Sequence, residues 1–208
     1  MEARIFADRR EAGKALALAL RAFKGKKVLV LALPRGGVEV GYEIALALEC
    51  PLDTIVARKV GAPGNPEYAV GAIAPGGIRV VDTWMDVEDI VRDETREMER
   101  RIEKYKSGSY AGAAEPEIVI VVDDGVATGK TAEAALRSAR ASYPNAKIVF
   151  AAPVGASDSI RKLQPECDEI VVLEAPPDFG AVGEWYASFP QVSDEEVVGY
   201  LEKARQIT

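Results

Sequence analysis

Two adjacent carboxylates, Asp123 and Asp124, stand between an apolar run and a loop that contains glycine and threonine. The run, residues 118–122, has the length of a buried strand, and the loop opens a helical pattern. Backbone N–H groups in such a loop, together with the N-terminus of the helix, form a nest that suits a phosphate. Carboxylates beside that nest would repel a bare anion, so they should face hydroxyl groups or a metal ion. A ribose and Mg²⁺ supply both.

The loop ends in Gly-Lys-Thr, and its nest-forming residues are Ala127, Thr128, Gly129, Lys130 and Thr131. This ending invites comparison with the G-x-x-x-x-G-K-[ST] loop of nucleoside triphosphatases. Only three residues separate the two glycines here, and Asp124 stands where the first glycine of that motif should be. A carboxylate directed into a triphosphate cradle would be unfavourable. An NTP-dependent kinase is therefore the weaker alternative, and it predicts that ATP binds at the Lys130 loop.

Basic residues follow two other apolar runs. Arg35 precedes Gly36 and Gly37 directly after the run 28–33, which indicates either an anion-binding loop or a tight turn that needs glycine. Arg58 and Lys59 follow the run 52–57 and either bind an anion or face solvent.

The composition excludes several classes of function. The 208 residues include 26 Lys and Arg against 33 Asp and Glu, and the net charge of −7 argues against nucleic acid as a partner. No histidine is present, which removes Ser-His-Asp triads and histidine-containing metal sites. No apolar run reaches the ~18 residues that a membrane span needs. Cys50 and Cys167 are expected to be buried thiols, and a cytoplasmic location is expected.

The apolar patterns predict the elements that would position these residues. Strands are expected at residues 28–33, 52–57, 118–122, 148–152 and 169–173, and helices at 9–23, 38–49, 86–106, 131–142, 157–163 and 193–206. A hairpin is expected around the Pro-Gly-Gly turn at 75–77, and a linker at 107–117. Residues 58–70, with their glycines and prolines, are expected to be an irregular, mobile lid. Alternating strands and helices predict an α/β fold with a doubly wound, mainly parallel sheet of about five strands.

The segment from residue 118 to residue 131 resembles the phosphoribosyl pyrophosphate (PRPP) signature of the type I phosphoribosyltransferases. It shows the same apolar strand, the same acidic pair and the same Thr-Gly-Lys-Thr loop. The resemblance extends over residues 27–173, because residues 34–37 are similar to the family's pyrophosphate loop and residues 58–70 to its flexible catalytic loop. It implies the doubly wound fold and a transfer of the 5-phosphoribosyl group from Mg-PRPP to a nitrogenous base.

The resemblance also implies roles for individual residues. Asp123 and Asp124 would contact the ribose hydroxyls and hold Mg²⁺, and residues 127–131 would hold the 5′-phosphate. Arg35, Gly36, Gly37, Arg58 and Lys59 would bind the pyrophosphate, which leaves an oxocarbenium-like centre that carboxylates favour. With Asp123 and Asp124, Lys59 and Glu67 complete the expected catalytic set.

Ala127 and Glu67 bear on the acceptor base. Relatives that act on hypoxanthine and guanine carry Asp where this chain has Ala127, whereas the adenine enzymes have Ala there and a Glu in the mobile loop. Glu67 is therefore the candidate general acid/base, and the alternative is a solvated loop carboxylate.

The expected organisation is one domain over residues 1–208, with a helical insertion at 79–116 and a C-terminal hood or tail at 174–208. Phe179, Trp185, Tyr186 and Phe189 either stack on a flat base or pack as a tail. The expected partners are PRPP and a small base, without nucleic acid or membrane, and a homodimer is common in the family. A regulatory protein that binds PRPP or a nucleotide without turnover is the second hypothesis.

Overall fold

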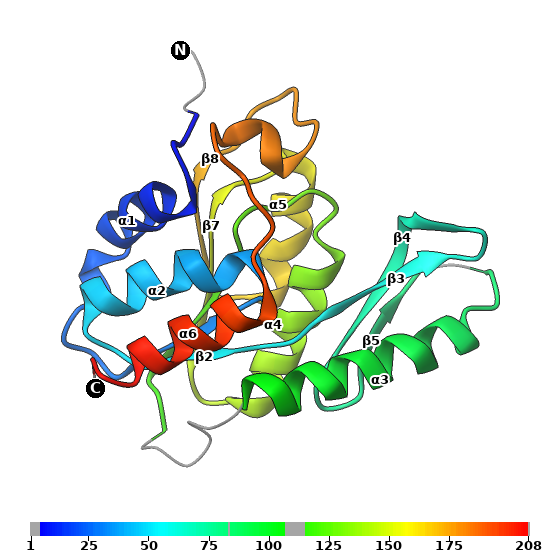
Figure 1. The fold of residues 1–208 in the computed structure, drawn as a ribbon, viewed down its shortest axis with the longest axis horizontal. Helices are drawn as coiled ribbons and strands as arrows, with labels where there is room; N and C mark the ends of the chain where they lie inside the picture. The colour runs from blue at the N-terminus through cyan, green and yellow to red at the C-terminus, as the bar shows by residue number, and fades with distance from the viewer. Residues whose placement is uncertain (1–4, 83, 107–114, 208) are drawn as a thin grey trace.

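A computed structural model describes residues 5–82, 84–106 and 115–207. At its centre lies a sheet of five parallel strands in the order β2-β1-β6-β7-β8 (Figure 1). The strands are β1 (Val28–Ala32), β2 (Leu52–Thr54), β6 (Ile118–Val122), β7 (Lys147–Val154) and β8 (Glu169–Glu174). The doubly wound sheet that the sequence predicts is thereby confirmed.

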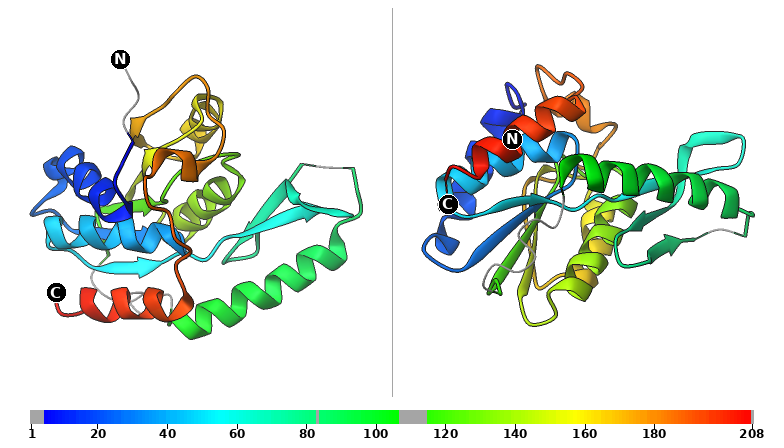
Figure 2. Two further views of the ribbon diagram at one scale, coloured as in Figure 1. Left: turned by 45° about the horizontal axis from the view of Figure 1, so that its top comes forward. Right: turned by 60° about the horizontal axis from the view of Figure 1, so that its bottom comes forward.

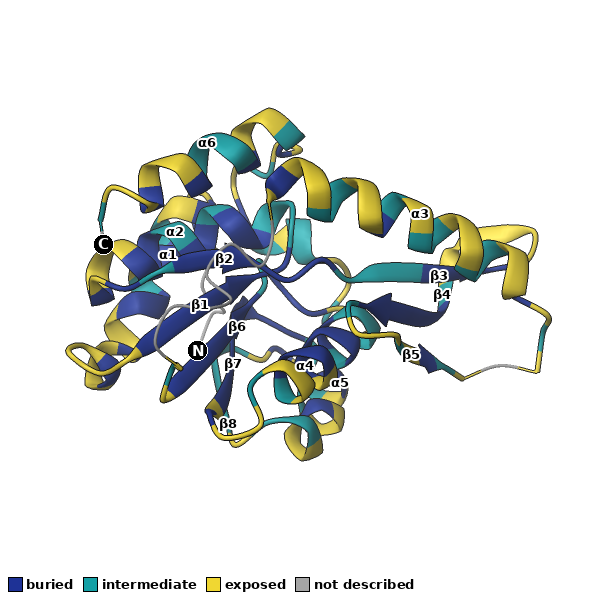
Figure 3. Ribbon diagram, turned by 90° about the horizontal axis from the view of Figure 1, so that it is seen from below, coloured by how far each residue is buried: buried dark blue, intermediate teal, exposed yellow. Residues whose placement is uncertain are grey.

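Helices cover both faces of this sheet (Figure 3). One face carries α1 (Arg9–Ala19), α2 (Gly36–Leu48) and α6 (Asp194–Ala204), and the other carries α4 (Lys130–Ser142) and α5 (Ser157–Leu163). Alternate strand residues serve the two sides, since Val28 and Val30 belong to the first core and Leu29 and Leu31 to the second. Burial on both faces explains why these strands read as continuous apolar runs.

Capping residues fix where the first and last helices begin. Asp8 accepts a hydrogen bond from the backbone N–H of Glu11. Ser193 and Glu196 form a capping box at the start of α6, with reciprocal bonds of 2.7 and 3.1 Å. Both caps confirm the helix starts expected from the sequence. Short 3₁₀ helices lie at η1 (Arg21–Phe23), η2 (Gln164–Glu166) and η3 (Val182–Trp185).

A second unit, which we call the arm, projects from one side of the main sheet (Figure 2). It consists of the antiparallel strands β3 (Arg58–Ala62), β4 (Asn65–Ala74) and β5 (Ile78–Val81), together with α3 (Glu88–Tyr105). The hairpin around residues 75–77 is confirmed as the connection of β4 to β5. The expectation that residues 58–70 lack regular structure is wrong, because they form most of the β3–β4 hairpin.

Glycines explain why residues 58–70 form a hairpin although their sequence is typical of a loop. Gly61 lies where a Cβ would stand 2.6 Å from the carbonyl oxygen of Pro66, and Gly71 lies where a Cβ would overlap the carbonyl of Val80. The strands therefore approach each other more closely than side chains would allow, and the register shifts beside Gly61. Residues that usually mark a loop are used here inside a sheet.

The one-sided helix expected at 86–106 is α3, which packs against β3, β4 and α6. Met98 and Tyr105 are buried, and Ile90, Val91 and Ile102 pack against the core. Of the linker expected at 107–117, residues 107–114 lie outside the described residues. No helix in the described ranges is long and apolar enough to cross a membrane.

Candidate functional site

The acid pair lies at the carboxyl edge of the main sheet, where ligands bind in open α/β folds. Asp123 and Asp124 follow β6 directly, and the loop after β1 lies beside them, since Ala32 pairs with Val122. A Cβ on Gly36 would overlap the carboxylate of Asp124, and a Cβ on Gly37 would stand 2.9 Å from the carbonyl oxygen of Val122. The two glycines are therefore required for close approach. The structure thus joins the predicted pyrophosphate loop to the acid pair.

Asp123 and Asp124 differ in their surroundings. The backbone N–H of Asp124 donates to Oδ1 of Asp123 at 2.9 Å. Burial and the neighbouring Asp124 charge raise the pKa of Asp123 well above its usual range. Asp124 instead pairs with Arg9, whose Nε lies 2.7 Å from Oδ2. The two adjacent carboxylates are therefore not equivalent.

Arg9 is a residue of the candidate site that the sequence did not reveal, and Tyr186, expected either to stack on a base or to pack in the tail, contacts the acid pair through its hydroxyl. Tyr186 Oη donates to the backbone oxygen of Asp124 at 2.6 Å, and burial, followed by the Asp124 charge, raises the pKa of the Tyr186 hydroxyl. Phe6 forms a parallel bridge with Tyr186, so segments far apart in the chain meet behind the acid pair. Arg9 carries no local signal, and Tyr186 stands out only as one of the tail aromatics, because each reaches Asp124 only through the fold.

The loop after the acid pair is fixed on its inner side. The Val126 N–H donates to Val154 O at 3.0 Å, and the Ala156 N–H donates to Val126 O at 2.8 Å. Ser159 Oγ donates to the carbonyl oxygen of Ala127 at 2.6 Å. On the outer side, Ala127 and Thr128 are exposed.

The helix that follows this loop completes the candidate phosphate site. Gly129 has a φ of 77°, the left-handed conformation that favours glycine, and is the N-cap of α4. Lys130 and Thr131 are the first residues of α4, so the predicted nest residues 127–131 surround a helix N-terminus. Such a terminus presents N–H groups that no helical carbonyl accepts. The arrangement suits a phosphate group.

Lys130 points towards the arm, with Nζ 3.7 Å from Asp82 Oδ2. A triphosphatase loop would need that amine over its phosphates. The contact therefore gives the kinase alternative no support.

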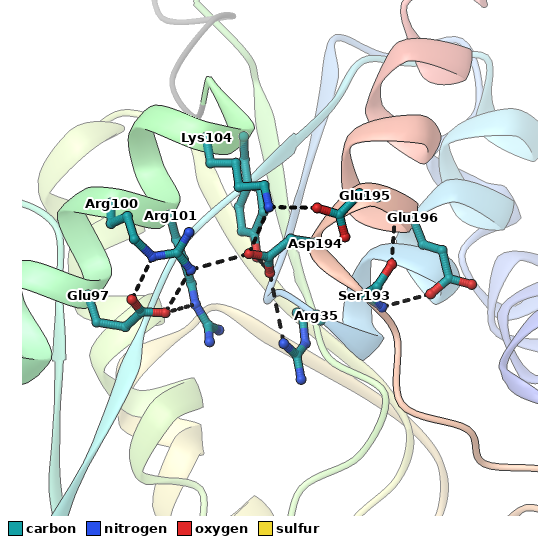
Figure 4. A network of polar contacts seen from close by, with 10 residues as sticks. Arg35, Glu97, Arg100, Arg101, Lys104, Ser193, Asp194, Glu195 and Glu196 are labelled. Atoms are coloured by element: carbon teal, nitrogen blue, oxygen red, sulfur yellow. Dashed lines mark hydrogen bonds and ion pairs between the residues drawn. The ribbon is translucent and has the colours of Figure 1, made fainter.

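Arg35 takes part in a polar network that joins the pyrophosphate loop to α3 and α6 (Figure 4). Its Nη1 lies 3.9 Å from Asp194 Oδ1, and its side chain is 35 % exposed. The other donors around Asp194 come from α3: Tyr105 Oη at 2.6 Å, Arg100 Nη2 at 3.2 Å and Lys104 Nζ at 3.3 Å.

The charge balance of this network leaves Arg35 loosely held. Burial acts to raise the pKa of Asp194, but the hydrogen bonds from α3 outweigh it and lower that pKa to about 2. One ionised carboxylate is thus shared among several cations, and Arg35 is the most distant of them. Its guanidinium keeps donors for an incoming anion.

The remaining predicted residues, Arg58, Lys59 and Glu67, lie on the arm. Arg58 pairs with Glu94 of α3 at 2.6 Å, and Lys59 pairs with Glu67 at 3.3 Å. The Glu67 side chain is 92 % exposed, and Glu67 is the third residue of β4, close to the turn that joins β3 to β4. The structure therefore gathers these three residues on a different unit from the acid pair.

The aromatic residues of the tail pack mainly against the protein. Phe179 stacks on Trp185, with ring centroids 6.2 Å apart, and Tyr186 stacks on Phe189 at 4.9 Å. With Phe6 and Val154 they form a small core of their own. This supports the packed tail among the two alternatives that the sequence leaves open.

The donor chemistry of the acid pair fits Mg²⁺. Mg²⁺ in phosphate-binding enzymes is held through one or two carboxylates, with further ligands from substrate phosphates. Asp123 and Asp124 provide two such carboxylates beside the candidate phosphate site. Among the described residues, no group of three His, Cys, Asp or Glu side chains is placed to hold a metal, so substrate oxygens would complete the coordination.

Comparisons with known proteins agree with this geometry. Residues 8–182 match the family model described as the phosphoribosyl transferase domain. Two proteins from strains of Mycobacterium tuberculosis, which carry the provisional name phosphoribosyl transferase, are 42 % identical over 98 % of this chain. The chain spans 48 % of the length of each. The crystal structure of TT1426 from Thermus thermophilus is 39 % identical, has a TM-score of 0.77 and covers 96 % of this chain and 98 % of its own. The chain belongs to the phosphoribosyl transferase domain family.

Proposed function

We propose that the protein transfers the 5-phosphoribosyl group of Mg-PRPP to a nitrogen atom of a small base and releases pyrophosphate. The observation that carries the proposal is the placement of two carboxylates between an anion-binding loop and a loop with a loosely held arginine, all at one sheet edge. In PRPP the two ribose hydroxyls lie between the 5′-phosphate and the pyrophosphate, as the acid pair lies between the two loops.

The proposed reaction breaks the bond between C1 of the ribose and the pyrophosphate oxygen, and forms a bond from C1 to nitrogen. Departure of pyrophosphate leaves positive charge on the sugar, which the carboxylates of Asp123 and Asp124 stabilise. Arg35 stabilises the negative charge on the leaving group. Bound Mg²⁺ would add charge neutralisation at the same pyrophosphate.

The acceptor nitrogen must also lose a proton. Glu67 is the candidate general acid/base for this step, and it lies on the arm with Lys59 as its partner. We therefore propose that Glu67 and Lys59 act only after the arm approaches the acid pair. Ala127 favours an acceptor of the adenine type over a 6-oxopurine.

The exposed position of Glu67 also favours a second candidate function, the binding of PRPP or a nucleotide without turnover. Both candidate functions use the same acid pair and the same two loops. They differ in whether the arm completes a catalytic site.

Pyrophosphate release from Mg-PRPP, measured against a panel of purine and pyrimidine bases, tests the proposal. We expect release with at least one base, and loss of that release in the double variant Asp123→Asn, Asp124→Asn. Asp124→Asn also removes the charged partner of the buried Arg9, so the urea denaturation curve of the double variant is recorded and its binding is expressed per folded molecule. Tight Mg-PRPP binding without pyrophosphate release in the presence of any base would favour the sensing function. Absence of Mg-PRPP binding would overturn both candidate functions.

The thiols fit a reducing, cytoplasmic setting, which we include in the proposal. Cys50 and Cys167 are both free, and burial raises their pKa values to about 12 and about 11. Such thiols are inert at neutral pH. A homodimer is also part of the proposal, and sedimentation of the protein tests it directly.

A further inference from the structure

Arg9 is a charged residue in an enclosed position. It is the first residue of α1, and its side chain is only 6 % exposed. A buried guanidinium is costly unless its charge and its hydrogen-bond donors are satisfied. What surrounds Arg9 therefore indicates why it is there.

Three contacts fix the guanidinium. Nε donates to Asp124 Oδ2 at 2.7 Å, and Nη1 donates to the carbonyl oxygen of Pro190 at 2.7 Å. The guanidinium carbon lies 3.7 Å from the centre of the Phe189 ring, close enough for a cation–π contact. One planar group thus joins α1, the tail and the acid pair.

Gly36 packs against the salt bridge between Arg9 and Asp124. A Cβ on Gly36 would overlap Asp124 Oδ2 and would stand 2.7 Å from Arg9 Nε. The loop after β1 therefore closes over the salt bridge. Because Gly36 and Arg9 both lie against Oδ2, the carboxylate of Asp124 has little freedom to rotate.

We propose that Arg9 is a positioning residue, which holds the carboxylate of Asp124 in the orientation that accepts hydrogen bonds from the ribose hydroxyls. The inference rests on the proposed function, since it concerns the ribose of the same substrate. Arg9 acts through Asp124. A lysine would keep the charge but would lack the planar fork that serves Asp124 and Pro190 together.

The neighbouring Arg10 offers a matched control. It also lies on α1 and pairs with a carboxylate, with Nε 3.0 Å from Glu43 Oε1, but its side chain is 65 % exposed and its partner lies on α2. The variants are Arg9→Met, Arg9→Lys and Arg10→Met. Isothermal titration calorimetry measures the affinity of each full-length variant for ribose 5-phosphate and for inorganic phosphate.

The ratio of these two affinities isolates the ribose. Inorganic phosphate does not need the acid pair, whereas the ribose hydroxyls of ribose 5-phosphate do. We expect Arg9→Met to lower the affinity for ribose 5-phosphate by about 10- to 100-fold, the range found when a group that orients a metal-binding side chain is lost. Its affinity for inorganic phosphate should remain within about twofold. Arg10→Met should leave both unchanged, and Arg9→Lys should restore part of the loss.

A double-mutant cycle tests whether the effect passes through Asp124. In an Asp124→Asn background, Arg9→Met should change the affinity for ribose 5-phosphate by less than about twofold, because the carboxylate it orients is already gone. If Arg9→Met does not fold, Arg9→Lys and the same cycle with that variant carry the test.

Four results would overturn the inference. An unchanged affinity for ribose 5-phosphate in the Arg9 variants would show that Arg9 does not serve the ribose. An equal loss for both ligands, or an undiminished effect in the Asp124→Asn background, would show a general structural role. If the wild-type protein binds ribose 5-phosphate no better than phosphate, the proposed function fails too, which distinguishes that failure from a failure at Arg9 alone.

Discussion

Replacement of Asp194 by asparagine should destabilise the protein in a pH-dependent way. The carboxylate is only 12 % exposed and receives hydrogen bonds from Tyr105, Arg100 and Lys104. Although burial opposes ionisation, these donors lower its pKa from 3.8 to about 2. A depression of nearly two pKa units corresponds to about 2 kcal/mol of stability at neutral pH.

The sign of the pH dependence follows from the direction of the shift. Because the pKa is lower in the folded protein than in the unfolded chain, the stabilisation is complete above the unfolded value near pH 4 and disappears as the pH falls through about 2. We expect the difference between wild type and Asp194→Asn to be about 2 kcal/mol at pH 7 and roughly half of that at pH 3.

Urea denaturation at a series of pH values between 3 and 7 measures this difference. Glu195→Gln is the control, because Glu195 lies in the same first turn of α6 and pairs with Lys104 at 2.8 Å, yet its side chain is 77 % exposed. Its effect should be much smaller at every pH. A cost of Asp194→Asn that stays the same at pH 3 and pH 7 would refute the reasoning, because a neutral loss of packing would then explain it.

Three further predictions concern the site and the arm. Crystals grown in sulfate should show an ordered anion on the backbone of residues 127–131, and an empty loop with sulfate bound elsewhere would contradict this expectation. Gly36→Ala should cost about 1–3 kcal/mol in urea denaturation and weaken Mg-PRPP binding, because its Cβ overlaps the Asp124 carboxylate; unchanged binding would show that the carboxylate moves freely. Trypsin should cut slowly after Lys59 even in the free protein, because its backbone is in the β3–β4 ladder opposite Ala72; rapid cutting there that Mg-PRPP suppresses would restore the mobile lid.

The parts of the fold that local patterns specify could be predicted from the sequence. The five parallel strands are short apolar runs between helical patterns. The acid pair and its loop are contiguous, so residues 118–131 alone predict a strand, the start of a helix and the candidate site between them. The caps at Asp8 and Ser193 were also visible, because a cap needs only a few neighbouring residues.

The remaining features depend on contacts between distant segments. Arg9 reads as an ordinary charge in the first turn of a helix, and only the fold brings it to Asp124, 115 positions away. Asp194 reads as a helix-start residue and turns out to connect α6 with α3. The β3–β4 hairpin was missed because Gly61 and Gly71 weaken the strand pattern while permitting close backbone approach.

Residues 6–9 and residues 186–190 meet behind Asp124, and this contact has a consequence for protein synthesis. The signature residues have all been made by residue 131. The Tyr186 hydroxyl, which donates to the Asp124 backbone, and the Pro190 carbonyl, which accepts from Arg9, come from the tail. Contacts of such long sequence separation form late, because the intervening loop must first be closed. We therefore expect a nascent chain arrested before residue 185 to carry a complete sequence motif but an unbraced acid pair. Competence to hold the sugar should appear only once the tail has left the ribosome and joined the first helix.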